Sequence, residues 1–248
     1  MYLRTHFGLI FLLIVSSAYA QADWLGSGEL GAVSSRGNSD TDTLNAKLDI
    51  ANETDVWKHA LYAGGLYGSN DIGTTAQRWD ARWQTDYRIT DPLFWFGAAR
   101  YERDHFGSFA YQESLSTGLG YKFIDNEITK LSAQVGAGIK RSEEQTLVKN
   151  DADEVIDRIE GESATRALFS VGVDFAHALT DTTKILNKLL IESTSSNTFI
   201  QNDLALQVSI NSSLALSVGY GIRQNSSPPP DSERMDTVTT LNLVYKIQ

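Results

Sequence analysis

The chain contains no cysteine, which in an exported protein excludes disulfide bonds, zinc–thiolate sites and iron–sulfur clusters. It has only four prolines in 248 residues, and three of them stand together at 228–230. Basic residues are also few: 21 Lys and Arg face 31 Asp and Glu, giving a formal charge of −10. So acidic a chain is a poor partner for nucleic acid. Hydrogen bonding and burial must therefore hold the fold together without disulfides.

Long apolar runs are missing too, apart from a short one near the N-terminus. Residues 1–20 predict a secretory signal peptide, with Arg4 as the positive region, an apolar core at 7–15 and a cleavage site after Ala20. That core is too short to span a bilayer as a helix, and no later stretch approaches about 20 apolar residues. We therefore expect export, no transmembrane helix and a single mature domain over residues 21–248.

What the chain has instead is strict two-residue alternation, clearest at residues 41–50. One face carries Leu44, Ala46, Leu48 and Ile50, and the other carries Thr43, Asn45, Lys47 and Asp49. Such a period predicts a β-strand that separates two different environments. The pattern returns about a dozen times along the chain. We therefore predict twelve strands, with ten or fourteen still open because the faces of residues 183–192 are less clean.

The spacing of these strands favours a barrel that crosses a membrane. Twelve strands over residues 21–248 leave about 19 residues each, of which about ten cross a bilayer at a tilt. Short turns are expected near residues 54, 91, 126, 181 and 212, and longer connections near 38, 72, 106, 152, 196 and 228. Two aromatic girdles are expected, one of Trp57, Tyr87, Trp95, Tyr121, Phe123, Phe175 and Tyr245, the other of Tyr67, Trp79, Tyr101 and Tyr111.

The predicted fold is therefore all-β: a transmembrane, antiparallel up-and-down β-barrel in the cell outer membrane, apolar outside and polar inside. The alternative is a secreted, soluble β-sandwich, whose apolar face would be a core and whose polar face would be wet. A sandwich rarely needs a regular alternation of short and long connections or a double aromatic belt. These two features decide the prediction in favour of the barrel.

Two neighbouring strands put an unusual number of charges on the lumen face. A three-residue turn at 90–92 would set Arg82 opposite Arg100, and directly opposed like charges are unfavourable. We therefore expect diagonal ion pairs, Arg82 with Glu102 and Arg100 with Asp80. The predicted lumen charge network comprises Arg78, Asp80, Arg82, Arg100, Glu102 and Asp104. It would act either as a constriction that sets ion selectivity or as a structural ladder that satisfies buried charges.

Motifs for catalysis or metal binding are weak. A lipid hydrolase would need a serine, a histidine base and an orienting group, and His105 between Asp104 and Ser108 is the best candidate base. The sequence around it has no nucleophile elbow. The acidic segments at 38–42 and 151–153 lack the glycine of a calcium loop. We predict no enzyme, cofactor or metal site, with an outer-membrane lipid hydrolase using His105 as the alternative.

Residues 142–162 interrupt the alternation with eight acidic and two basic residues, and predict a long external loop. The loop would be solvated, or would share divalent cations with lipopolysaccharide phosphates. The expected partners are outer-membrane lipid and lipopolysaccharide, the barrel-assembly machinery and small solutes or ions. Nucleic acid is not expected.

Two stretches carry a family resemblance: GAVSSRGNSDTDTLNAKLD within residues 30–49, and DTVTTLNLVY at 236–245. They resemble the YdiY-like family of uncharacterised outer-membrane proteins described as salt-induced (domain of unknown function 481). The resemblance would cover essentially the whole mature chain. It implies an outer-membrane, porin-like barrel in a Gram-negative bacterium, a link to salt or envelope stress, and no established activity.

Overall fold

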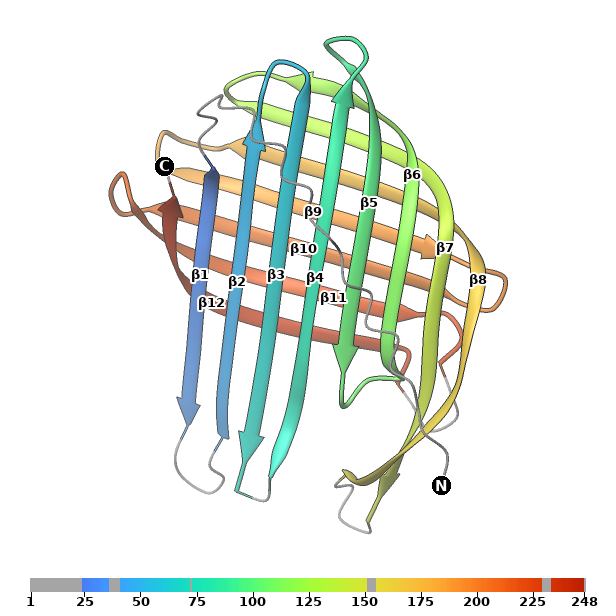
Figure 1. Ribbon diagram of the computed structural model, residues 1–248. Helices are drawn as coiled ribbons and strands as arrows, with labels where there is room; N and C mark the ends of the chain where they lie inside the picture. The colour runs from blue at the N-terminus through green and yellow to red at the C-terminus, as the bar shows by residue number, and fades with distance from the viewer. Residues whose placement is uncertain (1–23, 36–40, 72, 151–154, 229–232, 248) are drawn as a thin grey trace.

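The computed structural model describes residues 24–35, 41–71, 73–150, 155–228 and 233–247, which form a closed antiparallel barrel (Figure 1). Its strands are β1 (Leu25–Ser35), β2 (Thr41–Glu53), β3 (Trp57–Asn70), β4 (Thr74–Arg88), β5 (Leu93–Asp104), β6 (Phe109–Asp125), β7 (Thr129–Lys149), β8 (Val155–Ala178), β9 (Thr183–Ser193), β10 (Thr198–Ser209), β11 (Leu214–Asn225) and β12 (Met235–Ile247). The all-β, twelve-strand barrel prediction is confirmed. The expected signal peptide lies outside the described residues.

Each strand pairs with its neighbours in the chain, and β1 closes the ring against β12 through pairs such as Gly26 with Ile247. Figure 1 shows β1 to β8 curving across the front of the barrel while β9 to β12 cross behind them. Pairing of the first strand with the last closes the ring, which avoids the open sheet edge that is unfavourable in lipid.

The two faces of the wall are inverted relative to a soluble protein. In β2, Leu44 is 47% exposed on the outside while its neighbour Asn45 is 7% exposed in the lumen. Other exposed apolar side chains on the outer face are Leu115, Leu119, Val135, Ile139, Leu216, Val218, Leu241 and Leu243. Buried polar side chains include Gln112, Gln201, Gln207, Ser217 and Asn242. This distribution fits a wall in hydrocarbon and excludes the β-sandwich alternative. The described residues include no helix that is long and apolar enough to cross a membrane.

Aromatic rings gather at both ends of the outer face, as predicted. At one end the Trp57 and Tyr87 rings lie 4.9 Å apart. At the other end Tyr101 stacks between Trp79 and Tyr111, with ring centroids 4.9 and 6.3 Å apart. Amphipathic rings favour the membrane–water interface, so the two belts mark the two edges of the apolar band.

One rim of the barrel has the predicted short connections, at 54–56, 89–92, 126–128, 179–182 and 210–213, and we call it the turn rim. The opposite rim, called the loop rim, departs from prediction because its connections at 71–73, 105–108 and 194–197 are equally short. Residues 142–162 were expected to form a loop, yet most of them extend β7 and β8. Acidic side chains do not stop a hairpin, since its backbone groups pair with each other in water as well.

Phenylalanine rings fill the lumen where neighbouring strands carry glycine. A Cβ on Gly120 would lie 2.1 Å from Cζ of Phe94, and a Cβ on Gly136 would lie 2.7 Å from Cζ of Phe96. Phe96 is 1% exposed. The glycines of β6 and β7 therefore allow two rings to lie against the wall.

Candidate functional site

Strands β4 and β5 carry the six charges predicted for the lumen, in the predicted register: Arg78 faces Asp104, Asp80 faces Glu102 and Arg82 faces Arg100. The predicted diagonal pairs are wrong. Arg100 Nη2 instead lies 2.7 Å from Glu102 Oε2, and Arg82 Nη2 lies 3.4 Å from Asp80 Oδ2. Residues two apart on one strand share a face, so each arginine reaches a carboxylate on its own strand.

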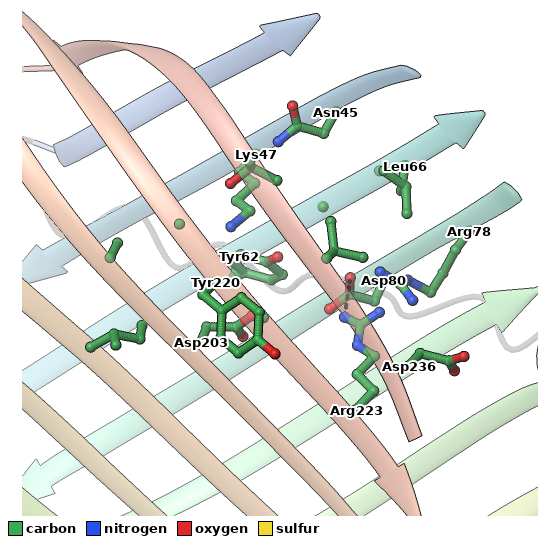
Figure 2. A pocket seen from close by; sticks show the side chains of 18 residues that line it. Asn45, Lys47, Tyr62, Leu66, Arg78, Asp80, Asp203, Tyr220, Arg223 and Asp236 are labelled. Atoms are coloured by element: carbon green, nitrogen blue, oxygen red, sulfur yellow. Dashed lines mark hydrogen bonds and ion pairs between the residues drawn. The ribbon is translucent and has the colours of Figure 1, made fainter. Parts of the chain in front are cut away.

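The opposite wall supplies further partners. Arg223 of β11 extends Nη2 to 3.4 Å from Asp80 Oδ1 and 3.8 Å from Glu102 Oε2. Arg82 Nη2 donates a hydrogen bond of 2.6 Å to Oε1 of Gln201 on β10. Since β4 is adjacent to neither β10 nor β11, these contacts cross the lumen. Figure 2 shows Arg223 and Asp80 meeting in this way.

Next to these contacts, three donors converge on the carboxylate of Glu192. It accepts hydrogen bonds from Ser114 Oγ at 2.6 Å, Lys140 Nζ at 2.8 Å and Arg100 Nη1 at 3.2 Å. The Arg100 guanidinium also lies 4.5 Å, and the Lys140 ammonium 4.9 Å, from the ring centroid of Phe199. All five side chains are buried. The group is therefore a buried, charge-paired plug between β5, β6, β7, β9 and β10.

The cross-lumen network is the combined set Arg78, Asp80, Arg82, Arg100, Glu102, Asp104, Ser114, Lys140, Glu192, Gln201, Asp203 and Arg223. It separates two spaces in the lumen. A chamber of about 410 Å³ opens towards the turn rim, where Glu53, Lys58 and Arg88 line it. A pocket of about 80 Å³ lies towards the loop rim, where Arg78 and Asp236 line it (Figure 2).

The boundary between the two spaces is narrow. Tyr62 and Asp203 line both of them. The Arg82 guanidinium lies 5.0 Å from the centroid of the Tyr62 ring and is held by Gln201, which donates 2.6 Å to Asp203 Oδ2. We call Tyr62, Arg82, Gln201 and Asp203 the constriction. Tyr62 and Asp203 border both spaces, and Arg82 and Gln201 are in contact with them.

His105 does not belong to this site. It lies in the loop between β5 and β6, where its backbone oxygen accepts 2.6 Å from Arg158 Nε. The Asp104 carboxylate accepts from the Phe106 backbone N–H at 2.9 Å. Among the described residues, no hydrogen bond joins the His105 ring to Ser108 or to Asp104. Burial, followed by the charges of Arg103 and Arg158, lowers the pKa of His105. The described residues also contain no group of three or more His, Asp or Glu placed to hold a metal ion.

The sequence prediction named six residues of the cross-lumen network and missed the other six: Ser114, Lys140, Glu192, Gln201, Asp203 and Arg223. The two-residue alternation places Gln201 and Arg223 on the polar faces of their strands, so their position in the lumen could have been predicted. Nothing in the alternation tells which strands meet across the lumen, so their partners could not be named.

The family model described as "Protein of unknown function, DUF481" matches residues 28–247. The chain is 23% identical over 241 residues to "Uncharacterized protein YdiY" of Escherichia coli (strain K12), covering 96% of this chain and 89% of that protein.

Among solved structures, the NanC porin has a TM-score of 0.47 at 7% identity, covering 89% of this chain and 97% of that one. The β-domain of the Bordetella autotransporter BrkA has a TM-score of 0.43 at 12% identity, covering 92% and 99%. The KdgM porin in complex with disordered oligogalacturonate has a TM-score of 0.42 at 8% identity, covering 90% and 98%. The family match extends over nearly all of the described barrel, and the chain belongs to the DUF481 family.

Proposed function

We propose that this protein is an outer-membrane barrel that passes small polar solutes or ions through a lumen narrowed at the constriction. The apolar outer band between two aromatic belts supports the location. The observation that carries the transport proposal is the pair of lumen spaces that meet at Tyr62 and Asp203, beside Arg82 and Gln201. Barrels of about 8 strands are filled by side chains and those of about 16 hold an open channel, so twelve strands suit a narrow passage.

The charges at the constriction should determine which ions the passage selects. Arg82 and Asp203 carry opposite signs within one ring of contacts, and Asp80, Glu102 and Arg223 lie directly beside it. Rings of charged side chains select ions by sign, and a single uncompensated charge shifts that selection. Replacing a positively charged side chain here should favour the passage of cations, and replacing a negatively charged side chain should favour the passage of anions.

Single-channel recording in planar bilayers tests the proposal. We expect a small conductance from the wild type, a larger one from Gln201→Ala, a shift towards cations in Arg82→Gln and a shift towards anions in Glu102→Gln. Heat-modifiable migration in detergent gels checks that each variant is folded. Asn211→Ala, in a turn at the turn rim, serves as a control that should conduct like the wild type.

If the wild type and Gln201→Ala are folded but give no conductance, the pore proposal is overturned. The cross-lumen network would then have a structural role. A wild type that conducts with a selectivity unchanged in Arg82→Gln and Glu102→Gln would place the selective element elsewhere in the lumen.

We also propose that the protein is not an enzyme. Among the described residues no hydrogen bond joins the His105 ring to a serine, so the candidate base lacks a nucleophile beside it. The refolded protein should turn over neither simple esters nor lipid A. Turnover that disappears in His105→Ala would establish the alternative, a lipid hydrolase.

The expected partners remain proposals: outer-membrane lipid and lipopolysaccharide around the wall, the barrel-assembly machinery during insertion, and small solutes or ions in the lumen. The link to salt or envelope stress rests on the family resemblance. Growth of a deletion strain in raised salt, compared with its complemented form, tests that link directly.

A further inference from the structure

Strand β8 extends well beyond the strand that should cover it. It pairs with β7 from Val155 onward, but with β9 only from Phe169 to Ala178. Within the described part of the chain, no strand pairs with residues 155–168 on the β9 side. The hairpin of β7 and β8 therefore projects past the loop rim, and its β8 side has no strand partner among the described residues (Figure 1). We call residues 155–163 the β8 edge.

The direction of the backbone groups along this edge follows from one hydrogen bond. The Gln145 N–H donates 3.2 Å to the Ser108 oxygen, so it points away from β8. Gln145 is paired with Glu160, and opposite residues of an antiparallel ladder either bond each other or both face outward. The N–H and C=O of Glu160 therefore face the open edge. Two residues earlier, the Arg158 N–H faces the same way, and it donates 2.8 Å to Asp157 Oδ1.

The hairpin is held in place, which keeps this edge extended. Gln145 Nε2 donates 2.8 Å to the Asp104 oxygen and 2.7 Å to the Gly107 oxygen. Arg158 Nε donates 2.6 Å to the His105 oxygen, and its guanidinium lies 4.8 Å from the Phe106 ring centroid. An edge fixed in strand geometry pays less conformational entropy when it pairs with an incoming chain.

The charge of the edge is one-sided. Asp157, Glu160 and Glu162 are all exposed, and the single basic residue of the edge, Arg158, is engaged with the β5–β6 loop. Charged side chains normally protect an open edge from pairing with an identical one, because like charges would line up. The same charges attract a strand of opposite sign.

We propose that the β8 edge binds an extended, basic peptide segment by strand addition. Backbone hydrogen bonds to the N–H and C=O of Glu160 and to the C=O of Arg158 would supply affinity, and lysine or arginine side chains on the peptide would pair with Asp157, Glu160 and Glu162. The site lies on the loop rim, outside the lumen, and is independent of any pore.

The test uses the full chain refolded in detergent micelles and a fluorescent peptide of about ten residues that alternates lysine and valine. Fluorescence anisotropy should detect binding that weakens with added salt. The same peptide with N-methyl groups on alternate residues keeps its charge but cannot form one row of hydrogen bonds, and should bind at least about tenfold more weakly. A glutamate–valine peptide should not bind.

Variants separate the backbone from the charge. Glu160→Pro removes the edge N–H without removing a bond to β7, and should bind much more weakly than Glu160→Ala, which lacks the same carboxylate but keeps the N–H. Heat-modifiable migration checks that the two variants are folded. If a variant does not fold, the N-methylated peptide still tests the proposal on the wild-type protein. The proposal is overturned if the lysine–valine peptide and its N-methylated form bind equally well, or if the lysine–valine peptide does not bind. Dimers of the wild type that Glu160→Pro abolishes would overturn it in favour of a second copy.

Discussion

Two ion pairs in this barrel share a distance and differ in burial. Arg100 Nη1 lies 3.2 Å from Glu192 Oε2, and Arg88 Nη2 lies 3.2 Å from Glu53 Oε1. The side chains of the first pair are 4% and 4% exposed, whereas those of the second are 36% and 48% exposed. Replacing each carboxylate by the isosteric amide, in Glu192→Gln and Glu53→Gln, therefore isolates the effect of the environment.

The expected cost of Glu192→Gln is large because it leaves buried cations without a full partner. Arg100 retains Glu102 at 2.7 Å, but Lys140 loses the only carboxylate with which it forms an ion pair in the described residues. Removing one partner from a buried pair costs about 3–5 kcal/mol. The amide oxygen can still accept the Ser114 hydroxyl, so we expect a value near the lower end, about 3 kcal/mol. Glu53→Gln should cost about 0–1 kcal/mol, since an exposed pair is screened by water.

Urea unfolding of the refolded protein in lipid vesicles, followed by tryptophan fluorescence, measures both values. Lys140→Met added to Glu192→Gln should recover part of the loss, because it removes the stranded ammonium group. A cost for Glu192→Gln within about 1 kcal/mol of that for Glu53→Gln would refute the reasoning. It would mean that water reaches the Glu192 cluster and that the plug is not dry.

Three further results are expected. Leu48→Arg, on the outer face, should cost about 2–4 kcal/mol in vesicle unfolding, whereas Ser116→Arg, facing the larger chamber, should cost less than about 1 kcal/mol; equal costs would mean the faces are misassigned. Gly120→Leu should abolish heat-modifiable migration, because its Cβ would meet the Phe94 ring at 2.1 Å. Burial and nearby arginines lower the pKa of His105, so its ring should be less than half protonated at pH 6.5 in an NMR titration.

The sequence predicted the wall more fully than the lumen. Alternation identifies the face of each residue, and the turn at 89–92 sets the register of β4 and β5, so the pairing of Arg82 with Arg100 could be derived. The hydrogen bond from Arg82 to Gln201 joins residues 119 positions apart. Which strands approach each other across the lumen depends on the curvature of the closed sheet, and a period of two carries no information about curvature.

The prediction of a loop at residues 142–162 was wrong for a different reason. Eight carboxylates and a broken alternation suggested a loop, because polar residues are common in loops. A two-stranded hairpin in water needs no apolar face along its whole length when its base is anchored in a sheet. Gln145 and Arg158 provide further anchors, through backbone oxygens of the β5–β6 loop. Composition alone cannot distinguish such an anchored hairpin from a loop.

The cross-lumen network also bears on how the barrel assembles. Arg82 and Arg100 come from β4 and β5, whereas Glu192, Gln201 and Arg223 come from β9 to β11, near the other end of the chain. A partly inserted sheet that ends at β8 would leave Arg82 and Arg100 with only the carboxylates of their own strands, and it would hold Lys140 of β7 without Glu192. An unpaired charge in hydrocarbon is strongly unfavourable. The lumen charges of β4 to β7 therefore gain their remaining partners only when the last strands close the ring. Intermediates that lack the last four strands should remain bound to whatever inserts them, instead of being released into lipid.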